Sequence, residues 1–497
     1  MRKYIINRII RSIISLIAVV AIVFVLIYSL IPKENIFNND TAITKYQGDN
    51  KINYIYTNYE RYGYLDYVTL SEYCVATYPD IESTEYFQCN KGVETNVEIS
   101  RFIEHYESLG YTTEMRSDGK PFAYKDINPI KMMLIWFKNL FIVDNPNSIQ
   151  SDLIDEDQRG IYFGKDWSGN VAIMCNGCTN KYQLYFDGSF PFIHQNWIKL
   201  NLGTSFPTYS GKSIVSVIGT SQGAEVMKTV TFPTGVVAES AIQEHSCQFK
   251  DYLNALEKQR FTDYYADCTT YKSDWSMIGT SFLIGIFSII IAYFVGIPIG
   301  MLMARNKNKA IDKIGMAYII FIISVPSLAY IFMFSRLGAA IGLPIKFPML
   351  GAHNVYSYIL PIVSLALPSI SGLMMWVRRY MIDQSLSDYV KFARSKGLSE
   401  NEIFYKHIMR NAIIPIAHSI PLNIVGTLVG AIITERVYAV PGMGKMLTDS
   451  INNYNNAMIV ALTFIYTALS ILGLLLGDIL ISMIDPRISF EGEGGRK

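Results

Sequence analysis

Six long apolar runs constrain this chain more than any other feature of its sequence. Each run reaches roughly 20 residues, the length that crosses the hydrocarbon core of a bilayer as an α-helix. Half of the 497 residues are hydrophobic and only 17% are charged, which leaves room for a folded part outside the membrane. The sequence predicts six transmembrane helices, near residues 9–31, 276–304, 314–337, 358–380, 411–434 and 457–484.

Proline interrupts two of these runs. Pro326 lies in the third run, and Pro361 and Pro368 lie in the fourth. Membrane helices tolerate proline where neighbouring groups bond the freed carbonyl, and they bend at that point. We therefore expect the third and fourth helices to be kinked.

The basic residues predict the orientation of the helices, because cytoplasmic loops carry an excess of Lys and Arg. The loop 338–357 holds only Lys346 and is expected outside. We expect both termini in the cytoplasm and residues 32–275 outside. No small-residue cleavage site follows the first run, so we interpret it as an anchor and not as a signal peptide. The basic residues of the cytoplasmic segments are Arg2, Lys3, Arg8, Arg11, Arg305, Lys307, Lys309, Lys313, Lys391, Arg394, Lys396, Lys406 and Arg410.

Residues 32–275 differ in composition from the rest of the chain. They contain 31 acidic and 21 basic residues, whereas the remainder contains 11 acidic and 22 basic residues. The segment is rich in Tyr, Phe, Ile and Val, in which disordered chains are poor. Residues 183–186 and 229–232 predict strands, and 97–109 predict a helix. We expect an α+β domain inserted between the first and second transmembrane helices.

All six cysteines lie in this outer segment. Cysteines confined to the outer side of a membrane favour disulfides. Sequence alone does not fix their pairing, and we expect local pairs between Cys74 and Cys89 and between Cys247 and Cys268. Three interpretations are open for Cys175 and Cys178, which are a bridge around a turn, a zinc half-site and a redox pair. The bridge is favoured, because neither a thioredoxin-like βαβ pattern nor a histidine cluster accompanies them.

Residues 388–415 form a basic, amphipathic stretch between the fourth and fifth apolar runs. Gly397 separates two helical halves, and glycine suits such a joint because it adopts positive φ at no steric cost. Ser399 is positioned to cap the second half, with Glu402 three residues later, the spacing of a capping box. The stretch predicts a helix, a glycine joint and a second helix on the cytoplasmic side.

This stretch resembles the cytoplasmic coupling loop of ABC importer permeases. The shared features are Ala393 and Gly397, four residues apart, the Arg-Asn-Ala run at 410–412 and Pro415. The sequence departs from the family pattern at two positions, where Lys391 replaces the usual acidic residue and Phe392 replaces alanine.

Three further segments extend the resemblance. Thr434-Glu435 and Pro441-Gly442-Met443-Gly444 follow in the order of the oligopeptide and dipeptide permeases, and Asp485-Pro486-Arg487 comes just after the last run. The chain resembles the B-type subunit of that family. Its enlarged outer domain and residues 190–194 are similar to the C subunit of Ami-type oligopeptide permeases of Gram-positive bacteria.

The resemblance implies a fold and its boundaries. We expect an all-α membrane protein of the type I ABC importer (MetI-like) architecture, with six transmembrane helices and the α+β domain between the first two. Residues 1–31 hold the cytoplasmic N-terminus and first helix, and 32–275 the extracellular domain. Residues 276–485 hold five helices and the coupling loop 381–412, and 486–497 form the cytoplasmic tail of a multi-pass protein in a bacterial cell membrane.

The resemblance also assigns roles to residues of the coupling loop. A short helix would dock in a groove of a nucleotide-binding subunit and pass its rigid-body motion to the spans. Ala393 and Gly397 are coupling-loop residues that match the family's motif. The expected buried contacts with the partner are Phe392, Leu398, Ile403 and Phe404, with Lys391, Arg394 and Lys396 as a charged rim.

A second set of residues lies at the outer end of the fifth run. A carboxylate at a membrane edge is often a solvated helix cap, but the resemblance makes Glu435, beside Thr434, a gating element. The simplest structure for Pro441, Gly442 and Gly444 is a tight turn, since proline and glycine set its backbone angles.

The chain carries no Gly-x4-Gly-Lys-Ser/Thr loop, so we expect ATP and Mg²⁺ to be bound by partner subunits. We expect no catalytic or metal site and no cofactor in this chain. The implied partners are a homologous second permease, two ABC ATPases, an extracellular peptide-binding lipoprotein, a peptide substrate and membrane lipid, but no nucleic acid.

The predicted function is that of an oligopeptide importer permease that forms half of the pathway. Dipeptides, nickel chelates or another solute of the same family are alternative substrates. A membrane-anchored receptor or adhesion protein, with the outer domain as its working part, is the alternative from a different class. An enzyme that acts at the outer face is a third alternative, but the sequence shows no recognisable set of catalytic residues.

Overall fold

Five long helices form the membrane part of the computed structural model. The structure describes residues 2–91, 97–149, 152–166, 169–186, 193–219, 227–240, 246–267 and 276–484. Within these ranges, five helices are long and apolar enough to cross a bilayer, as five of the six predicted runs require. They are α1 (Arg2–Leu30), α9 (Met277–Arg305), α12 (Tyr356–Ser385), α16 (Ile414–Tyr438) and α18 (Asn456–Ile484).

The run at 314–337 differs from the prediction of one kinked helix. The chain forms two helices, α10 (Ala310–Ser324) and α11 (Ser327–Ala340), which meet at 113°. Val325 is extended, because the ring of the following Pro326 disfavours helical geometry in the residue before it. The proline also lacks the N–H that would continue the helix. The described chain therefore has six spans only if this bent pair counts as one.

Helices α9 and α12 pack closely through two glycines of α9. A Cβ atom on Gly296 would lie 2.9 Å from the Leu373 Cβ, and one on Gly300 would lie 2.8 Å from the Val377 Cβ. Small residues let membrane helices approach each other at such distances. The Gly296–Gly300 stretch therefore serves helix packing.

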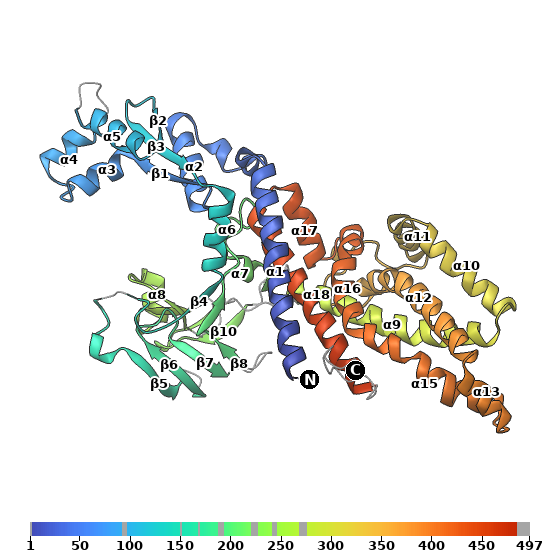
Figure 1. Ribbon diagram of the computed structural model, residues 1–497. Helices are drawn as coiled ribbons and strands as arrows, with labels where there is room; N and C mark the ends of the chain where they lie inside the picture. The colour runs from blue at the N-terminus through green and yellow to red at the C-terminus, as the bar shows by residue number, and fades with distance from the viewer. Residues whose placement is uncertain are drawn as a thin grey trace, which may run out of the picture.

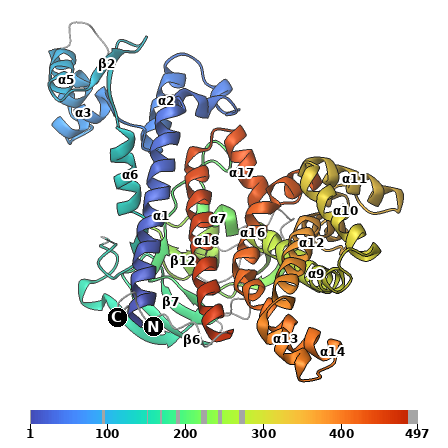
Figure 2. The same ribbon diagram turned by 45° about the vertical axis from the view of Figure 1, so that its right-hand side comes forward.

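Helix α1 packs along α18, away from α9 and α12 (Figure 2). Val20 and Phe24 of α1 are buried in one cluster with Val460 of α18. An ion pair between Arg8 and Asp478 joins the other ends of the same two helices. Asp478, an ionisable residue inside a span, is therefore paired with a basic residue of the same chain.

The outer segment begins with a small lobe beyond the end of α1. Its antiparallel sheet has the strand order β1-β3-β2, and Phe102 is fully buried against it. Helix α5 confirms the helix expected at 97–109. The elements are 3₁₀ turns at Lys33–Phe37 and Ile43–Lys45, then α2 (Gly48–Arg61), β1 (Leu65–Thr69), α3 (Leu70–Thr77), α4 (Thr84–Cys89), α5 (Val97–Ser108), β2 (Thr112–Met115), β3 (Pro121–Asp126) and the connecting α6 (Pro129–Lys138).

A second lobe follows, built around the four-stranded antiparallel sheet β5-β6-β7-β8. Strands β7 and β10 confirm the two strands expected from the sequence. Both lobes mix helices and strands. The elements are β4 (Phe141–Val143), a 3₁₀ turn (Glu156–Gln158), β5 (Gly160–Lys165), β6 (Val171–Asn176), β7 (Tyr182–Phe186), β8 (Ile193–Gln195), β9 (Ile198–Leu200), α7 (Ile214–Gly219), β10 (Lys228–Thr231), β11 (Val237–Ser240), β12 (Ser246–Phe249), α8 (Ala255–Arg260) and β13 (Tyr265–Asp267).

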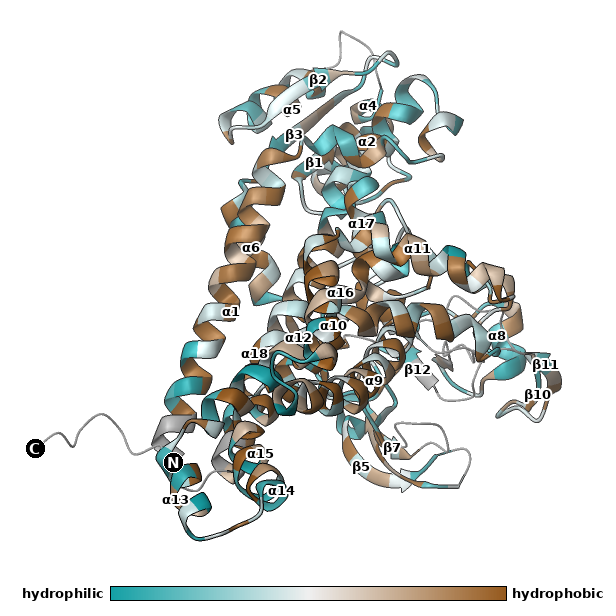
Figure 3. Ribbon diagram, turned by 90° about the vertical axis from the view of Figure 1, so that its right-hand side faces the viewer, coloured by the Kyte–Doolittle hydropathy of each residue, from teal (hydrophilic) through white to brown (hydrophobic). Residues whose placement is uncertain are grey.

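The remaining elements divide between the two ends of the bundle. Helix α17 (Met443–Asn452) lies at the end that carries α2 (Figure 1). The coupling loop lies at the opposite end, together with the N-terminal end of α1 (Figures 1 and 3). Its elements are α13 (Asp388–Ser395), α14 (Glu400–Glu402), a π-helix (Ile403–Ile408) and α15 (Met409–Ala412). Hydrophobic residues run along α1, α6 and α9, whereas α13 and α14 carry hydrophilic ones (Figure 3).

Candidate functional site

The joint of the coupling loop has the backbone that the sequence predicts. Gly397 has a φ of +76° and donates its N–H to the Arg394 carbonyl at 2.9 Å. The Ser399 hydroxyl accepts a hydrogen bond from the Glu402 N–H at 3.3 Å and so caps α14. The Glu402 side chain forms an ion pair with Lys406 at 2.7 Å, one helical turn further on.

One face of the coupling loop is buried in this chain itself. Ala393 is 5% exposed, and Ile403 is fully buried in a cluster with residues of α9 and α12. The expectation that Ile403 contacts an ATPase subunit is therefore wrong, because its side chain has no surface left for a partner. Ile403 and Ala393 fix the loop to the ends of the spans, and rigid attachment is what a lever requires.

The opposite face of the loop presents an exposed aromatic side chain. Phe392 is 60% exposed, and the Lys396 ammonium lies 4.5 Å from the centre of its ring. Leu398 and Phe404 are half-buried. Phe392 is therefore the best placed of the predicted contact residues for a partner's groove, and Leu398 and Phe404 can contribute their exposed edges.

One ion pair of the charged rim crosses the glycine joint between the two halves of the loop. Arg394 makes two hydrogen bonds to the Glu400 carboxylate, at 2.8 and 3.2 Å, across the glycine joint. The Lys391 ammonium bonds Asp388 at 2.9 Å. These pairs are exposed and contribute little stability by themselves. They leave basic side chains beside Phe392, as the sequence predicted.

A polar contact connects the coupling loop to α9. The Arg305 guanidinium donates to the Asn401 Oδ1 at 2.6 Å and lies 5.8 Å from the centre of the Phe404 ring. Nearby, Arg378 of α12 makes a bidentate pair with the buried Asp312 of α10, at 2.5 and 2.8 Å. The coupling loop, α9, α10 and α12 are thus connected at one end of the bundle, where movement of the loop would reach three spans.

The C-terminal end of α16 holds a buried carboxylate. Glu435 is fully buried, and its two oxygens accept hydrogen bonds from the Ser281 hydroxyl at 2.6 Å and from the Lys445 N–H at 3.0 Å. The same Ser281 oxygen accepts the Met443 N–H at 2.9 Å. Thr434 is 1% exposed. The geometry excludes the solvated helix cap, and Glu435 instead ties α9, α16 and α17 together.

Gly442 and Gly444 leave room for the Glu435 carboxylate and let α17 pack closely against α16. A Cβ atom on Gly442 would lie 2.4 Å from the Glu435 carboxylate, and one on Gly444 would lie 2.6 Å from the Ile432 Cα. Pro441 directly precedes Gly442, which is the N-cap of α17. The stretch is therefore a helix start packed on Glu435 and not merely a turn, a close approach that sequence spacing did not reveal.

Two asparagines at the start of α18 join the outer segment to the spans. The Asn455 Nδ2 donates to the Ser205 hydroxyl at 2.8 Å and the Thr208 hydroxyl at 2.6 Å, and the Asn456 Nδ2 donates to the Tyr64 hydroxyl at 2.9 Å. Both asparagines are at least 99% buried. They follow the last residue of α17, whose first turn packs on the buried Glu435. Sequence reasoning missed this attachment, because polar residues at a helix start ordinarily indicate only a cap.

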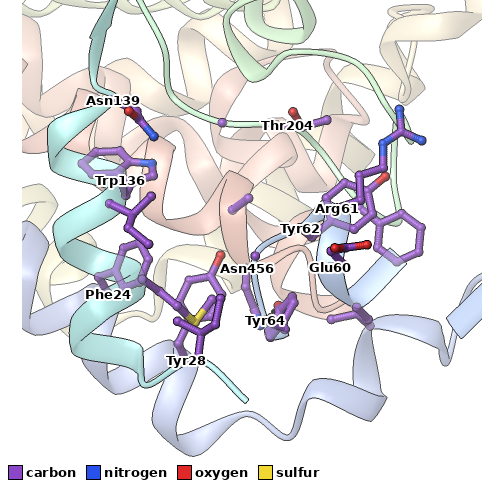
Figure 4. Close-up of a pocket in the computed structure, with 18 of the residues that line it drawn as sticks. Phe24, Tyr28, Glu60, Arg61, Tyr62, Tyr64, Trp136, Asn139, Thr204 and Asn456 are labelled. Carbon is purple, nitrogen blue, oxygen red and sulfur yellow. Dashed lines mark hydrogen bonds between the residues drawn. The ribbon is translucent and has the colours of Figure 1, made fainter. Parts of the chain in front are cut away.

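A cavity of about 280 Å³ lies at this junction. Figure 4 shows aromatic rings of α1 and α6 on one side, including Phe24 and Trp136, and the charged side chains of Glu60 and Arg61 on the other. Asn456 lies between them. Apolar contacts also join the small lobe to the spans beside this cavity, including the Tyr28 and Tyr64 rings, whose centres lie 5.4 Å apart.

Among the described residues of the outer segment, the structure contains two disulfides, Cys74–Cys89 and Cys175–Cys178. Cys74, Cys89, Cys175 and Cys178 are each at most 1% exposed. Such burial fits structural bridges better than a redox pair.

Cys268 lies outside the described residues, as do residues 190–192 and the 485–487 motif. Within the described ranges, no group of three or more His, Cys, Asp or Glu side chains could hold a metal ion.

A buried carboxylate organises the loop after the second bridge. Asp144 accepts hydrogen bonds from the Thr179 and Asn180 N–H groups and from the Asn180 and Gln183 side chains, at 2.7 to 3.0 Å. Burial raises the pKa of the Asp144 carboxyl, but these hydrogen bonds outweigh burial, and the pKa lies below its usual value. The carboxylate therefore stays charged at neutral pH and joins the residue after β4 to the segment 179–183.

Comparisons with known proteins agree with this geometry. Residues 296–490 match the family model described as "Binding-protein-dependent transport system inner membrane component". The chain is 37% identical, over all of both chains, to the oligopeptide transport system permease protein AmiC of Streptococcus pneumoniae. It is 32% identical to the dipeptide transport system permease protein DppB of Lactococcus lactis, over 42% of this chain and 68% of that protein.

These matches distinguish the two parts of the chain. The match to the dipeptide permease covers less than half of this chain, whereas the match to AmiC includes the outer segment as well. The chain therefore belongs to the ABC importer permeases, in the family of oligopeptide transport system permease proteins.

Proposed function

We propose that this chain is one membrane subunit of an ATP-driven oligopeptide importer and forms half of its translocation pathway. The observation that carries the proposal is the coupling loop, which is fixed to three spans on one face and presents Phe392 on the other. A receptor or adhesion protein has no need of such an anchored lever. The similarity to AmiC over the whole chain supports oligopeptides as the substrate.

The proposed complex contains a homologous second permease, two ATPase subunits that bind ATP and Mg²⁺, and a peptide-binding lipoprotein outside. This composition can be tested by gentle detergent extraction from the native membrane, followed by purification through a tag on this chain. We expect a second permease and two ATPases to co-purify, with ATP hydrolysis stimulated by loaded binding protein. Recovery of the chain alone would favour the receptor alternative. Competition of labelled peptide uptake by dipeptides and nickel chelates tests the alternative substrates.

The proposed orientation places the coupling loop and both termini in the cytoplasm and residues 32–275 outside. It is supported by the basic residues at one end of the bundle and by the disulfides of the outer segment. The sheet β5–β8 lies level with the N-terminal half of α1 (Figures 1 and 3). Open sheet edges are unstable in hydrocarbon, because their N–H and C=O groups lie unpaired. We therefore expect the bilayer to displace this lobe toward the outer end of α1.

Cysteine labelling on intact cells tests this orientation. We expect the unreduced protein to react weakly with a membrane-impermeant maleimide and strongly after an impermeant reductant, since all six cysteines lie in the outer segment. A Cys175→Ser/Cys178→Ser variant should lose part of the signal, which reports on the displaced lobe. Labelling that requires permeabilised cells would contradict the orientation, and six freely reactive thiols without reductant would contradict the disulfides.

The outer lobe farthest from the spans is the proposed docking site for the binding protein. Helices α3 and α4 lie at its far end (Figure 1), and the Phe87 side chain of α4 is 58% exposed. Exposed aromatic residues are enriched at protein interfaces. We expect Phe87→Asp to weaken binding of the loaded binding protein by about tenfold or more and to leave basal ATP hydrolysis unchanged.

A matched control is Val237→Asp in β11, where the side chain is 60% exposed in the other lobe. Binding affinity in nanodiscs should be unchanged by this substitution. Equal affinity of wild type and the Phe87→Asp variant would reject this docking site and leave the small lobe a protective or stabilising role.

A further inference from the structure

A cavity of about 480 Å³ lies between three membrane helices, α9, α12 and α16. It is separate from the cavity of Figure 4, and its walls include Tyr293, Trp376, Tyr380 and Thr427. None of the fifteen residues recorded around it is charged. An uncharged, partly polar cavity between spans offers hydrogen bonds without attracting or repelling a charged solute.

The polar groups of this cavity are neutral hydrogen-bonding groups. The Asn423 Nδ2 donates to the Tyr293 hydroxyl at 2.9 Å and to the Ser419 hydroxyl at 3.3 Å. No hydrogen bond from the described residues reaches the Asn423 Oδ1, so this oxygen can accept one from a solute. Peptide N–H and C=O groups are the donors and acceptors that such side chains complement.

Two glycines keep the cavity open. Gly372 of α12 and Gly426 of α16 both line it, and a Cβ atom on either would have nothing within 4 Å. This differs from Gly296 and Gly300 of α9, whose Cβ positions are blocked by α12. Close helix packing therefore explains Gly296 and Gly300 and does not explain Gly372 and Gly426.

We propose that this cavity is a substrate-contact site, in which neutral side chains bind the main chain of a passing peptide. Gly372 and Gly426 set the largest peptide side chain that passes. Main-chain groups are common to all peptides, and no fixed charge faces the cavity, so selection here depends on side-chain volume and not on charge. The inference rests on the proposed oligopeptide import. It adds the place in the pathway where peptides are selected and the property, side-chain volume, by which they are selected.

Enlarging the glycines tests selection by volume. In the purified complex, Gly372→Leu and Gly426→Leu should reduce uptake of a phenylalanine tripeptide roughly tenfold or more and that of an alanine tripeptide by less than about threefold. Binding of both peptides to the binding protein should not change. The control Gly219→Leu, at an open position of the outer segment, should leave both uptake rates unchanged. Equal losses for both peptides in an assembled complex would overturn the volume filter.

Cysteine protection tests contact without relying on altered uptake. The spans contain no cysteine, so Gly372→Cys and Gly426→Cys are unique reporters there. We expect a small water-soluble thiol reagent to label them, more slowly while an alanine tripeptide is being imported. Unchanged labelling during continuing uptake would overturn this inference and leave the proposed function intact. If the wild-type complex imports no peptide, the proposed function fails, and protection by the solute that it does import decides whether the cavity is a contact site.

Discussion

Replacing Gly397 with valine is expected to abolish peptide uptake while leaving the protein inserted in the membrane. The residue has a φ of +76°, and a Cβ atom there would meet nothing within 4 Å, so the cost is backbone strain and not collision. For a β-branched residue that strain is about 1–3 kcal/mol. The exposed joint is held by few contacts and will relax, which turns Phe392 away from its docking position.

Strain of this size corresponds to a roughly 5- to 150-fold loss of affinity for the ATPase subunits. We therefore expect the Gly397→Val permease pair to reach normal abundance, to retain little ATPase after purification and to show no substrate-stimulated hydrolysis. The matched control is Gly397→Asn, because asparagine tolerates the left-handed region better than other side chains do. Uptake by the asparagine variant should remain within about threefold of wild type.

A second comparison separates docking from folding. Phe392→Ala removes an exposed ring and should weaken ATPase binding, whereas Ile403→Ala removes a buried side chain and should destabilise the permease by about 2–5 kcal/mol. Full uptake by the valine variant at Gly397, or equal effects of the two alanine variants on stability, would contradict the assignment of this loop.

The sequence determined the parts of the coupling loop that depend on local chemistry. Gly397 and Ser399 could be placed because positive φ and helix capping are properties of single residues and their neighbours. It could not show which face of the loop is buried. Ile403 and Phe392 are both apolar, and only the packing against α9 and α12 decides that the first is inside and the second outside.

The membrane helices show the same division between local and long-range information. Run length and hydropathy predicted six spans, and five of them are single helices long and apolar enough to cross a bilayer in the described chain. The 113° bend at Pro326 was underestimated, since a proline permits a kink whose size depends on what the two halves pack against. The Asn455 and Asn456 contacts join residues more than two hundred positions apart, and no local pattern marks them.

Gly442→Ala is expected to have the second large effect, because the new methyl group would collide with the buried Glu435 carboxylate. The new methyl group would lie 2.4 Å from the Glu435 carboxylate, so the carboxylate must move away from Ser281 or from the Lys445 N–H. A buried carboxylate that loses a hydrogen bond is destabilised by about 1–3 kcal/mol or more. We expect a lower thermal stability of the complex and at least about tenfold slower uptake.

A double-mutant cycle shows whether Glu435 acts beyond stability. Glu435→Ala removes the group that collides with the new methyl, so Gly442→Ala should cost little in that background. The two substitutions should therefore show a coupling energy of about 0.5–3 kcal/mol. Additive effects on stability would contradict the close approach of Gly442 and Glu435.

Uptake by the double variant then decides the gating role. If Glu435 only stabilises this end of α16, the loss of uptake in the double variant should be no larger than its loss of thermal stability explains. If its bonds to α9 and α17 control the opening of the pathway, uptake should stay low while ATP hydrolysis continues, because the outer helices are no longer tied to the movement of the spans. We expect the second outcome, since Glu435 joins three helices at the end where the outer segment is attached.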